Sequence, residues 1–229
     1  RLANAISTLI DANSNIKADW LFEDVITPTS EDLEYLEDLM EAYPISEVME
    51  LHGIKRARLS GKDWYITVFY KPSINVDGFE SGYMGPGTKT IIPAWAKARI
   101  DIRLVPNMNS DKVINKLREY LDAHGFSDVE IIVHDKYEWS KTSPKAEIAV
   151  SAHKAYSHLG LKGRTITMLP GSAPTYLFTR VLGIPSIAAG PGHGARAHAP
   201  NEYIEVEAVK SLIKYGALIM YEYSKTEKD

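Results

Sequence analysis

Two histidines stand in a glycine-rich segment near the end of the chain, GPGHGARAHAPNEYI, residues 190–204. An imidazole in such a loop can bind a metal ion, titrate near neutral pH or lie in solvent. His198 precedes the segment Ala199-Pro200-Asn201-Glu202, whose proline and asparagine hold it outside the helix expected next. His198 is therefore a candidate metal ligand, although one imidazole is not sufficient for a metal site.

A second loop whose side chains could bind a ligand is LPGSAP, residues 169–174. Ser172 can cap the helix expected after it or contact a bound ligand. Both loops follow predicted strands, and open α/β sheets bind their ligands at such loops. The Gly-x-Ser-x-Gly elbow of serine hydrolases is absent, and glycines 190–194 do not have the spacing of a dinucleotide loop or a P-loop.

The surrounding pattern predicts a series of helices and strands. Apolar periodicity and capping residues predict helices over residues 2–10, 30–43, 110–124, 144–159, 174–182 and 205–224. β-Branched and aromatic runs predict strands over residues 63–70, 96–105, 129–133, 164–169 and 185–189, with the first two paired in one sheet. Alternation typical of antiparallel strands predicts an α+β sandwich before residue 140.

The pattern changes near residue 140, where we place a domain boundary. Residues 141–229 alternate strand and helix, as a mostly parallel sheet requires. Two strands are only part of such a sheet, so we expect this segment to complete a sheet whose other strands lie elsewhere. The chain also opens with Arg1 and an uncapped helix, which suggests that it starts inside a longer gene product.

Composition excludes several functional classes. The 229 residues carry a net charge of -4 and no cysteine, which argues against nucleic-acid binding, disulfides and thiolate metal sites. No apolar run has the length of a membrane span. A reducing cytoplasm fits the absence of cysteine.

Three separated motifs resemble the M20 family of metallopeptidases, the aminoacylase, carnosinase and carboxypeptidase G relatives. The motifs are the segment from His198 to Glu202, the run from Pro72 to Pro93, and Ile102-Arg103-Leu104-Val105-Pro106. The resemblance implies an α+β lid, a two-layer sandwich with an antiparallel sheet and helices, over residues 1–140, lacking its first strand. It implies that residues 141–229 are the C-terminal half of an α/β zinc-peptidase catalytic domain.

The resemblance also implies roles for individual residues. His198 would bind zinc, in a two-zinc site that can also take manganese or cobalt, and Arg103 would bind the substrate carboxylate. Ser172, Thr90 and Asn75 would contact substrate or the developing oxyanion. The residues alone leave alternatives open: Arg103 as a surface salt-bridge partner, Ser172 as a helix cap and Asn75 as a turn residue.

The remaining metal ligands of the family, in a His-x-Asp motif and a Glu-Glu motif, do not occur in this chain. We therefore expect part of a hydrolase that cleaves dipeptides or N-acyl amino acids with a free carboxylate, inactive by itself and with no catalytic residue of its own. Without its partners the chain is not expected to retain zinc. A homodimer through the lid is a family-based expectation. The alternative is a non-catalytic dimerisation or peptide-binding module of the same fold.

Overall fold

The computed structural model describes residues 1–226, which form two compact units. Unit 1 comprises Arg1–Pro28, Arg58–Trp139 and Leu169–Pro174, and unit 2 comprises Thr29–Ala57, Ser140–Met168 and the residues from Thr175 onward. No helix of residues 1–226 has both the length and the apolar character that crossing a membrane requires. The units describe packing, so the predicted domain division at residue 140 stays a prediction.

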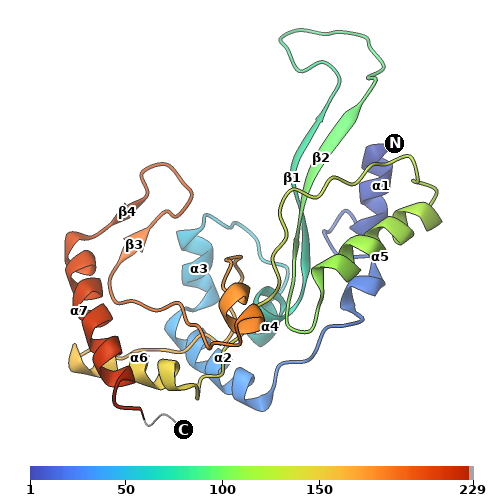
Figure 1. The fold of residues 1–229 in the computed structure, drawn as a ribbon. Helices are drawn as coiled ribbons and strands as arrows, with labels where there is room; N and C mark the ends of the chain where they lie inside the picture. The colour runs from blue at the N-terminus through green and yellow to red at the C-terminus, as the bar shows by residue number, and fades with distance from the viewer. Residues whose placement is uncertain (227–229) are drawn as a thin grey trace. The chain divides into compact units, whose positions relative to one another are not determined.

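Unit 1 is a two-stranded antiparallel ribbon with helices at its base (Figure 1). Its elements are α1 (Leu2–Leu9), the 3₁₀ turn η1 (Asp19–Phe22), α4 (Gly61–Tyr70), β1 (Ser73–Ser81), β2 (Ala96–Arg103) and α5 (Ser110–Ala123). Asn109 caps α5 by accepting a hydrogen bond from the Lys112 amide, as its sequence predicts.

The base of the ribbon has one apolar face and one polar face because successive strand residues point to opposite sides. Ile74, Ile100 and Ile102 pack against the core of unit 1. The buried members of that core are Leu9, Ala18, Leu21, Ile74, Val105, Met108 and Val113. The residues that alternate with these isoleucines therefore face away from the core.

A β-bulge interrupts the ribbon. Val76 pairs with Ile100 and Gly78 pairs with Arg99, so Asp77 is an extra residue in β1. Below the bulge, Asn75 lies opposite Asp101 and Ser73 lies opposite Arg103. This register places four polar residues together on the face that points away from the core.

Three predictions for unit 1 are wrong. Residues 63–70 form α4 rather than a strand, and the partner of β2 is β1, which was not predicted as a strand. The run WYITVFY is apolar except for Thr67 and lacks alternation, so its composition alone does not separate helix from strand. Burial of Tyr65 and Tyr70 in the helix outweighs β-propensity. Residues 129–133 form no strand.

Unit 2 is mainly helical. It contains α2 (Ser30–Ala42), α3 (Ile45–Leu51), α6 (Glu147–His158), the π-helical turn η2 (Leu177–Val181), β3 (Gly194–Ala195), β4 (Tyr203–Ile204) and α7 (Val206–Tyr223). Thr29 caps α2 in a capping box with Asp32. Helices α6 and α7 pack on each other through Ala152, Ala155 and Tyr215 (Figure 1).

The predicted parallel strands of unit 2 are wrong for the described residues, because 164–169 and 185–189 form no strand. A strand exists only as a hydrogen-bonded neighbour of another strand, and these segments do not pair with each other. The helix predicted over 174–182 is reduced to the five residues of η2. Helices α6 and α7 lie where the sequence places them.

Candidate functional site

Arg103, the last residue of β2, is held by two side chains. Its Nη1 donates to Ser172 Oγ at 2.6 Å, and its Nε lies 2.8 Å from Asp101 Oδ2. The ion pair with Asp101 matches the surface salt bridge that the sequence allowed for Arg103. The contact with Ser172 joins two of the residues that the family resemblance singled out.

Arg103 and Asp101 share a face of β2 because they are two residues apart in a strand. Asn75 lies on the same face of the ribbon, opposite Asp101, and its Nδ2 donates to Ser73 Oγ at 3.3 Å. Asn75 therefore belongs to a strand, and the alternative that it is a turn residue is wrong. Its side chain is exposed.

Ser172 does not cap a helix. The first helical turn after it is η2, whose N-cap is Tyr176 and has no side-chain cap hydrogen bond. The Ser172 hydroxyl instead accepts from Arg103. Gly171 and Ala173 on either side carry no bulky side chain, so the loop can approach the guanidinium closely.

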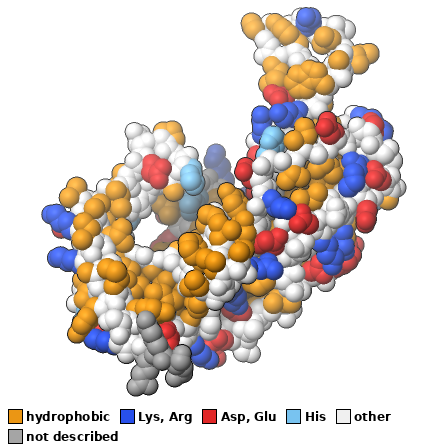
Figure 2. Space-filling view, viewed as in Figure 1, with side chains coloured by type: hydrophobic (Ala, Val, Ile, Leu, Met, Phe, Trp, Pro, Cys, Tyr) orange, Lys and Arg blue, Asp and Glu red, His pale blue; other side chains and the backbone are white. Residues whose placement is uncertain are grey.

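Thr90 lies apart from this cluster, in the loop that joins β1 to β2 at the far end of the ribbon. The eight residues of β2 span roughly 23 Å at about 3.3 Å per residue, and Arg103 is at the opposite end. Apolar side chains gather over that end (Figure 2); the exposed ones include Tyr83, Met84, Ile91, Ile92 and Trp95. The structure therefore does not bring Thr90 to Arg103 within one chain.

His198 lies in the loop of the β3–β4 hairpin, in unit 2. Arg196, His198 and Asn201 have φ of 64°, 62° and 62°, in the left-handed region that His and Asn tolerate better than most residues. Glu202 Oε2 accepts a hydrogen bond from the His198 amide at 3.3 Å. Because the pairing of β3 with β4 fixes both ends of the loop, the imidazole is presented to solvent from a defined backbone.

The described residues do not by themselves fit a zinc site. Within residues 1–226, no group of three or more His, Asp or Glu side chains converges as a metal site requires. Closed zinc sites need four ligands and catalytic sites three. His198 is therefore at most one donor.

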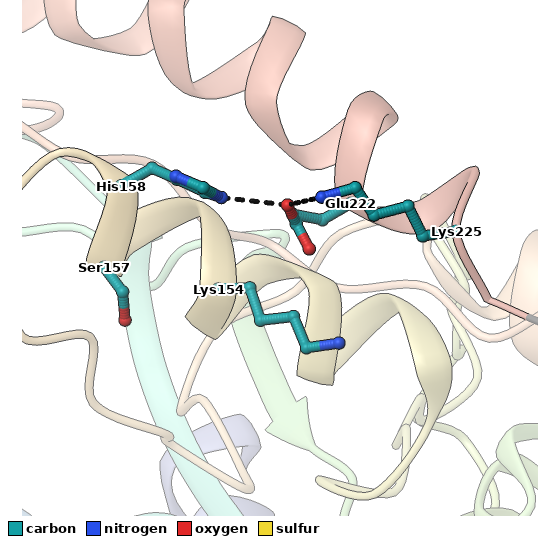
Figure 3. Close-up of a pocket in the computed structure, with 5 residues that line it drawn as sticks. All are labelled: Lys154, Ser157, His158, Glu222 and Lys225. Atoms are coloured by element: carbon teal, nitrogen blue, oxygen red, sulfur yellow. Dashed lines mark hydrogen bonds and ion pairs between the residues drawn. The ribbon is translucent and has the colours of Figure 1, made fainter.

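A shallow pocket of about 430 Å³ lies at the ends of α6 and α7 (Figure 3). Glu222, 4% exposed, accepts from Lys225 Nζ at 2.7 Å and contacts His158 Nε2 at 2.9 Å. The hydrogen bonds from Lys225 and His158 hold the pKa of Glu222 below its usual value. The charges compensate one another, so this cluster joins the two helices rather than forming a catalytic site.

Comparison with known proteins identifies the family and relatives of the chain. A family model described as the peptidase dimerisation domain, M20_dimer, matches residues 1–129. The chain is 24% identical over 238 residues to the Cys-Gly metallodipeptidase DUG1 of Saccharomyces cerevisiae, across 100% of this chain and 49% of that protein. It is 25% identical over 123 residues to the Beta-Ala-His dipeptidase of Rattus norvegicus, across 53% of this chain and 25% of that protein.

Solved structures of peptidases also match the chain. The M20 family metallo-carboxypeptidase Sso-CP2 from Sulfolobus solfataricus matches with a TM-score of 0.88 and 31% identity, over 97% of this chain and 51% of that one. The dipeptidase Dug1p from Saccharomyces cerevisiae matches with a TM-score of 0.81 and 25% identity, over 99% and 49%.

The α+β fold class is confirmed by these structures. The chain spans about half the length of the relatives that it matches most completely. The predicted family is confirmed by the match over residues 1–129, which include the motif around Arg103. The chain belongs to the M20 peptidase dimerisation-domain family.

Proposed function

We propose that this chain supplies the substrate-binding lid and one metal ligand of a metal-dependent hydrolase that cleaves dipeptides or N-acyl amino acids. The observation that carries the proposal is the guanidinium of Arg103, held between Asp101 and Ser172. A planar guanidinium with a free edge binds a carboxylate through two parallel hydrogen bonds. Substrates with a free C-terminal carboxylate therefore suit this site.

Zinc is the proposed cofactor, as two ions in the complete enzyme, with manganese or cobalt as alternatives. His198 is the proposed ligand from this chain, and the other ligands and the proton-transferring carboxylate would come from residues that the chain does not contain. The catalytic step is accordingly assigned to none of residues 1–226. A cytoplasmic location, based on the absence of cysteine, remains part of the proposal.

A homodimer through the ribbon fits the separation of Thr90 from Arg103. Within residues 1–226, β1 and β2 form a two-stranded sheet, so each strand has an outer edge that can pair with another chain. In such a dimer Thr90 would serve the site of the partner, because the length of β2, roughly 23 Å, lies between the loop of Thr90 and Arg103 of the same chain. Sedimentation of the chain as a monomer only, at micromolar concentration, would contradict the dimer.

Hydrolysis assays test the proposal directly. Residues 1–229 with added zinc or manganese are expected to leave Cys-Gly and β-Ala-His intact. The same chain, joined to or mixed with a segment that carries the His-x-Asp and Glu-Glu motifs, is expected to hydrolyse one of them. Robust metal-dependent hydrolysis by residues 1–229 alone would refute the assignment of the remaining ligands to another segment.

The second candidate is a non-catalytic dimerisation or peptide-binding module. It is favoured by the family match, which covers the dimerisation domain over residues 1–129. The two candidates differ in the coding sequence that precedes Arg1. A continuous reading frame with the two metal-binding motifs supports the enzyme, whereas a start codon next to Arg1 supports the module.

A further inference from the structure

Asp101 contacts the guanidinium of Arg103 through a carboxylate oxygen that is buried. Oδ2 lies 2.8 Å from Nε as an ion pair, and among residues 1–226 this oxygen is buried without a hydrogen-bond partner. No role for Asp101 follows from the family motifs, because the motif that contains Arg103 begins at Ile102. Its position two residues before Arg103 in a strand is nevertheless what places the carboxylate beside Nε.

The two contacts fix the guanidinium at different points. Asp101 holds the Nε side of the group, and Ser172 accepts from Nη1. Because a guanidinium is planar, contacts at two of its nitrogens leave little freedom of rotation. Among residues 1–226 no partner is found for Nη2, so the edge formed by Nη1 and Nη2 remains accessible to an incoming carboxylate.

The ion pair contributes little to the stability of the fold. The side chain of Arg103 is 40% exposed and that of Asp101 is 33% exposed, and ion pairs in such surroundings are weak because water screens them. Asp101 also lowers the net positive charge at Arg103, which by itself would weaken anion binding. Neutralising Asp101 should therefore weaken carboxylate binding if Asp101 orients Arg103, and strengthen it if only the net charge matters.

We propose that Asp101 is a positioning residue, which holds Arg103 in the orientation that receives the substrate carboxylate. The inference rests on the proposed function, since it takes Arg103 as the group that binds carboxylate. Asp101 acts through Arg103 and does not itself touch the substrate. Its replacement by Asn keeps the shape of the side chain and removes the charge.

The test is a nuclear magnetic resonance titration of residues 1–229 with glycylglycine, and with glycylglycinamide as the probe that lacks a carboxylate. The Nε–H signal of Arg103 is assigned by its loss in Arg103→Lys. Asp101→Asn is compared with Asp122→Asn, which neutralises the partner of Arg118 on α5, 2.7 Å away. The control makes the same change of charge in the same unit, away from the ribbon.

The expected result has two parts. The Nε–H signal of Arg103 exchanges with water faster in Asp101→Asn and is unchanged in Asp122→Asn. Affinity for glycylglycine falls about fivefold in Asp101→Asn only, as for the loss of one partly exposed ion pair, and the amide probe binds none of the variants.

Other results have distinct meanings. Wild-type protein in which glycylglycine does not perturb the Arg103 signal would refute the carboxylate site of the proposed function. Wild-type protein that binds glycylglycine, together with Asp101→Asn that binds it equally or more tightly, would overturn the positioning role and leave the carboxylate site standing. An Arg103 signal that is identical in Asp101→Asn and wild type would also overturn the positioning role.

Discussion

Arg103 and Ser172 are 69 residues apart in the chain, and the Arg103 Nη1 donates to the Ser172 hydroxyl at 2.6 Å. One comes from the end of a strand and the other from a loop, and both belong to unit 1. Ser172 thus returns to the ribbon from the segment that follows α6. The contact couples the lid motif of the sequence to the loop that contains Gly171 and Ser172.

Arg103→Lys should damage substrate binding far more than Arg99→Lys. Lysine keeps the charge of Arg103 but loses the two-donor edge that pairs with a carboxylate. In the assembled enzyme we expect the loss of about 2–4 kcal/mol of binding free energy in the transition state, which lowers kcat/KM roughly 30- to 700-fold. Arg99 lies on the same strand face, so Arg99→Lys controls for general effects on the ribbon; equal losses in both variants would argue against a carboxylate site at Arg103.

Lys141→Ala should destabilise unit 2 more than Lys145→Ala. Lys141 Nζ contacts both oxygens of Asp32, at 2.6 and 2.7 Å, and Asp32 is 4% exposed. Burial raises the pKa of Asp32, but the hydrogen bonds from Lys141 and Thr29 outweigh it and leave that pKa below its usual value. Loss of Lys141 leaves a buried carboxylate with fewer partners, at a cost of about 1–3 kcal/mol.

Lys145 provides the control because it pairs with Glu31 at 2.9 Å with a side chain that is 80% exposed. Its removal should hardly change the free energy of unfolding, because water screens an exposed ion pair. Urea unfolding of both variants gives the comparison. Similar losses of unfolding free energy in Lys141→Ala and Lys145→Ala would show that burial of Asp32 does not determine the strength of its ion pair.

Gly192→Ala should disturb the segment that leads to His198. A Cβ at Gly192 would lie 2.3 Å from Ala208 Cβ and 2.7 Å from its Cα, and φ is +126°. Overpacking against a helix backbone costs about 1–3 kcal/mol, with strain in addition. Gly216, within α7, has open space, so Gly216→Ala should stabilise by roughly 0.5–1 kcal/mol; thermal unfolding of both variants checks the signs.

Stability should depend on pH through Glu222. Its folded pKa is lowered from 4.5, first by Lys225 and then by His158. A carboxyl with a lowered folded pKa stabilises the protein above its unfolded pKa and loses that contribution as the pH falls through the folded value. The difference in unfolding free energy between wild type and Glu222→Gln should therefore be largest near neutral pH and shrink below about pH 4.

Glu207→Gln on the same helix is the matched control, since its ion pair with Lys210 is exposed at 77% for the Glu207 side chain. Its effect should be small at every pH. Urea unfolding series at several pH values decide the matter. A Glu222→Gln effect that does not change with pH would contradict the assignment of that contribution to the ionised carboxylate.

Sequence analysis predicted the family and the elements whose pattern is local. Capping of α2 at Thr29 and of α5 at Asn109 depends on neighbours within four residues, and the structure confirms both. The positions of Asn75 and Thr90 at opposite ends of one ribbon depend on a register that composition does not encode. The strand predicted over residues 63–70 is a helix, α4. Helix and strand differ there only through the burial of Tyr65 and Tyr70.

Arg103 and Ser172 are in contact, and the two-residue spacing in Asp101-Ile102-Arg103 is a sequence signal that also places Asp101 beside them. The roles of Arg103, Ser172, His198, Thr90 and Asn75 all remain proposals. Their chemistry depends on groups that local sequence patterns cannot place in space.

The extra residue in β1 also sets the chemistry of the whole ribbon surface. Ile74 and Phe79 have opposite parity in the sequence, yet Asp77 brings them to the same side, where Phe79 lies opposite Ala98 and Ile74 opposite Ile102. If Asp77 were paired regularly instead of being accommodated by the bulge, every side chain on one half of β1 would be reversed relative to the other. The ring of Phe79 would then lie on the face that carries Asn75 and Arg103. That face of the ribbon would change from polar to apolar.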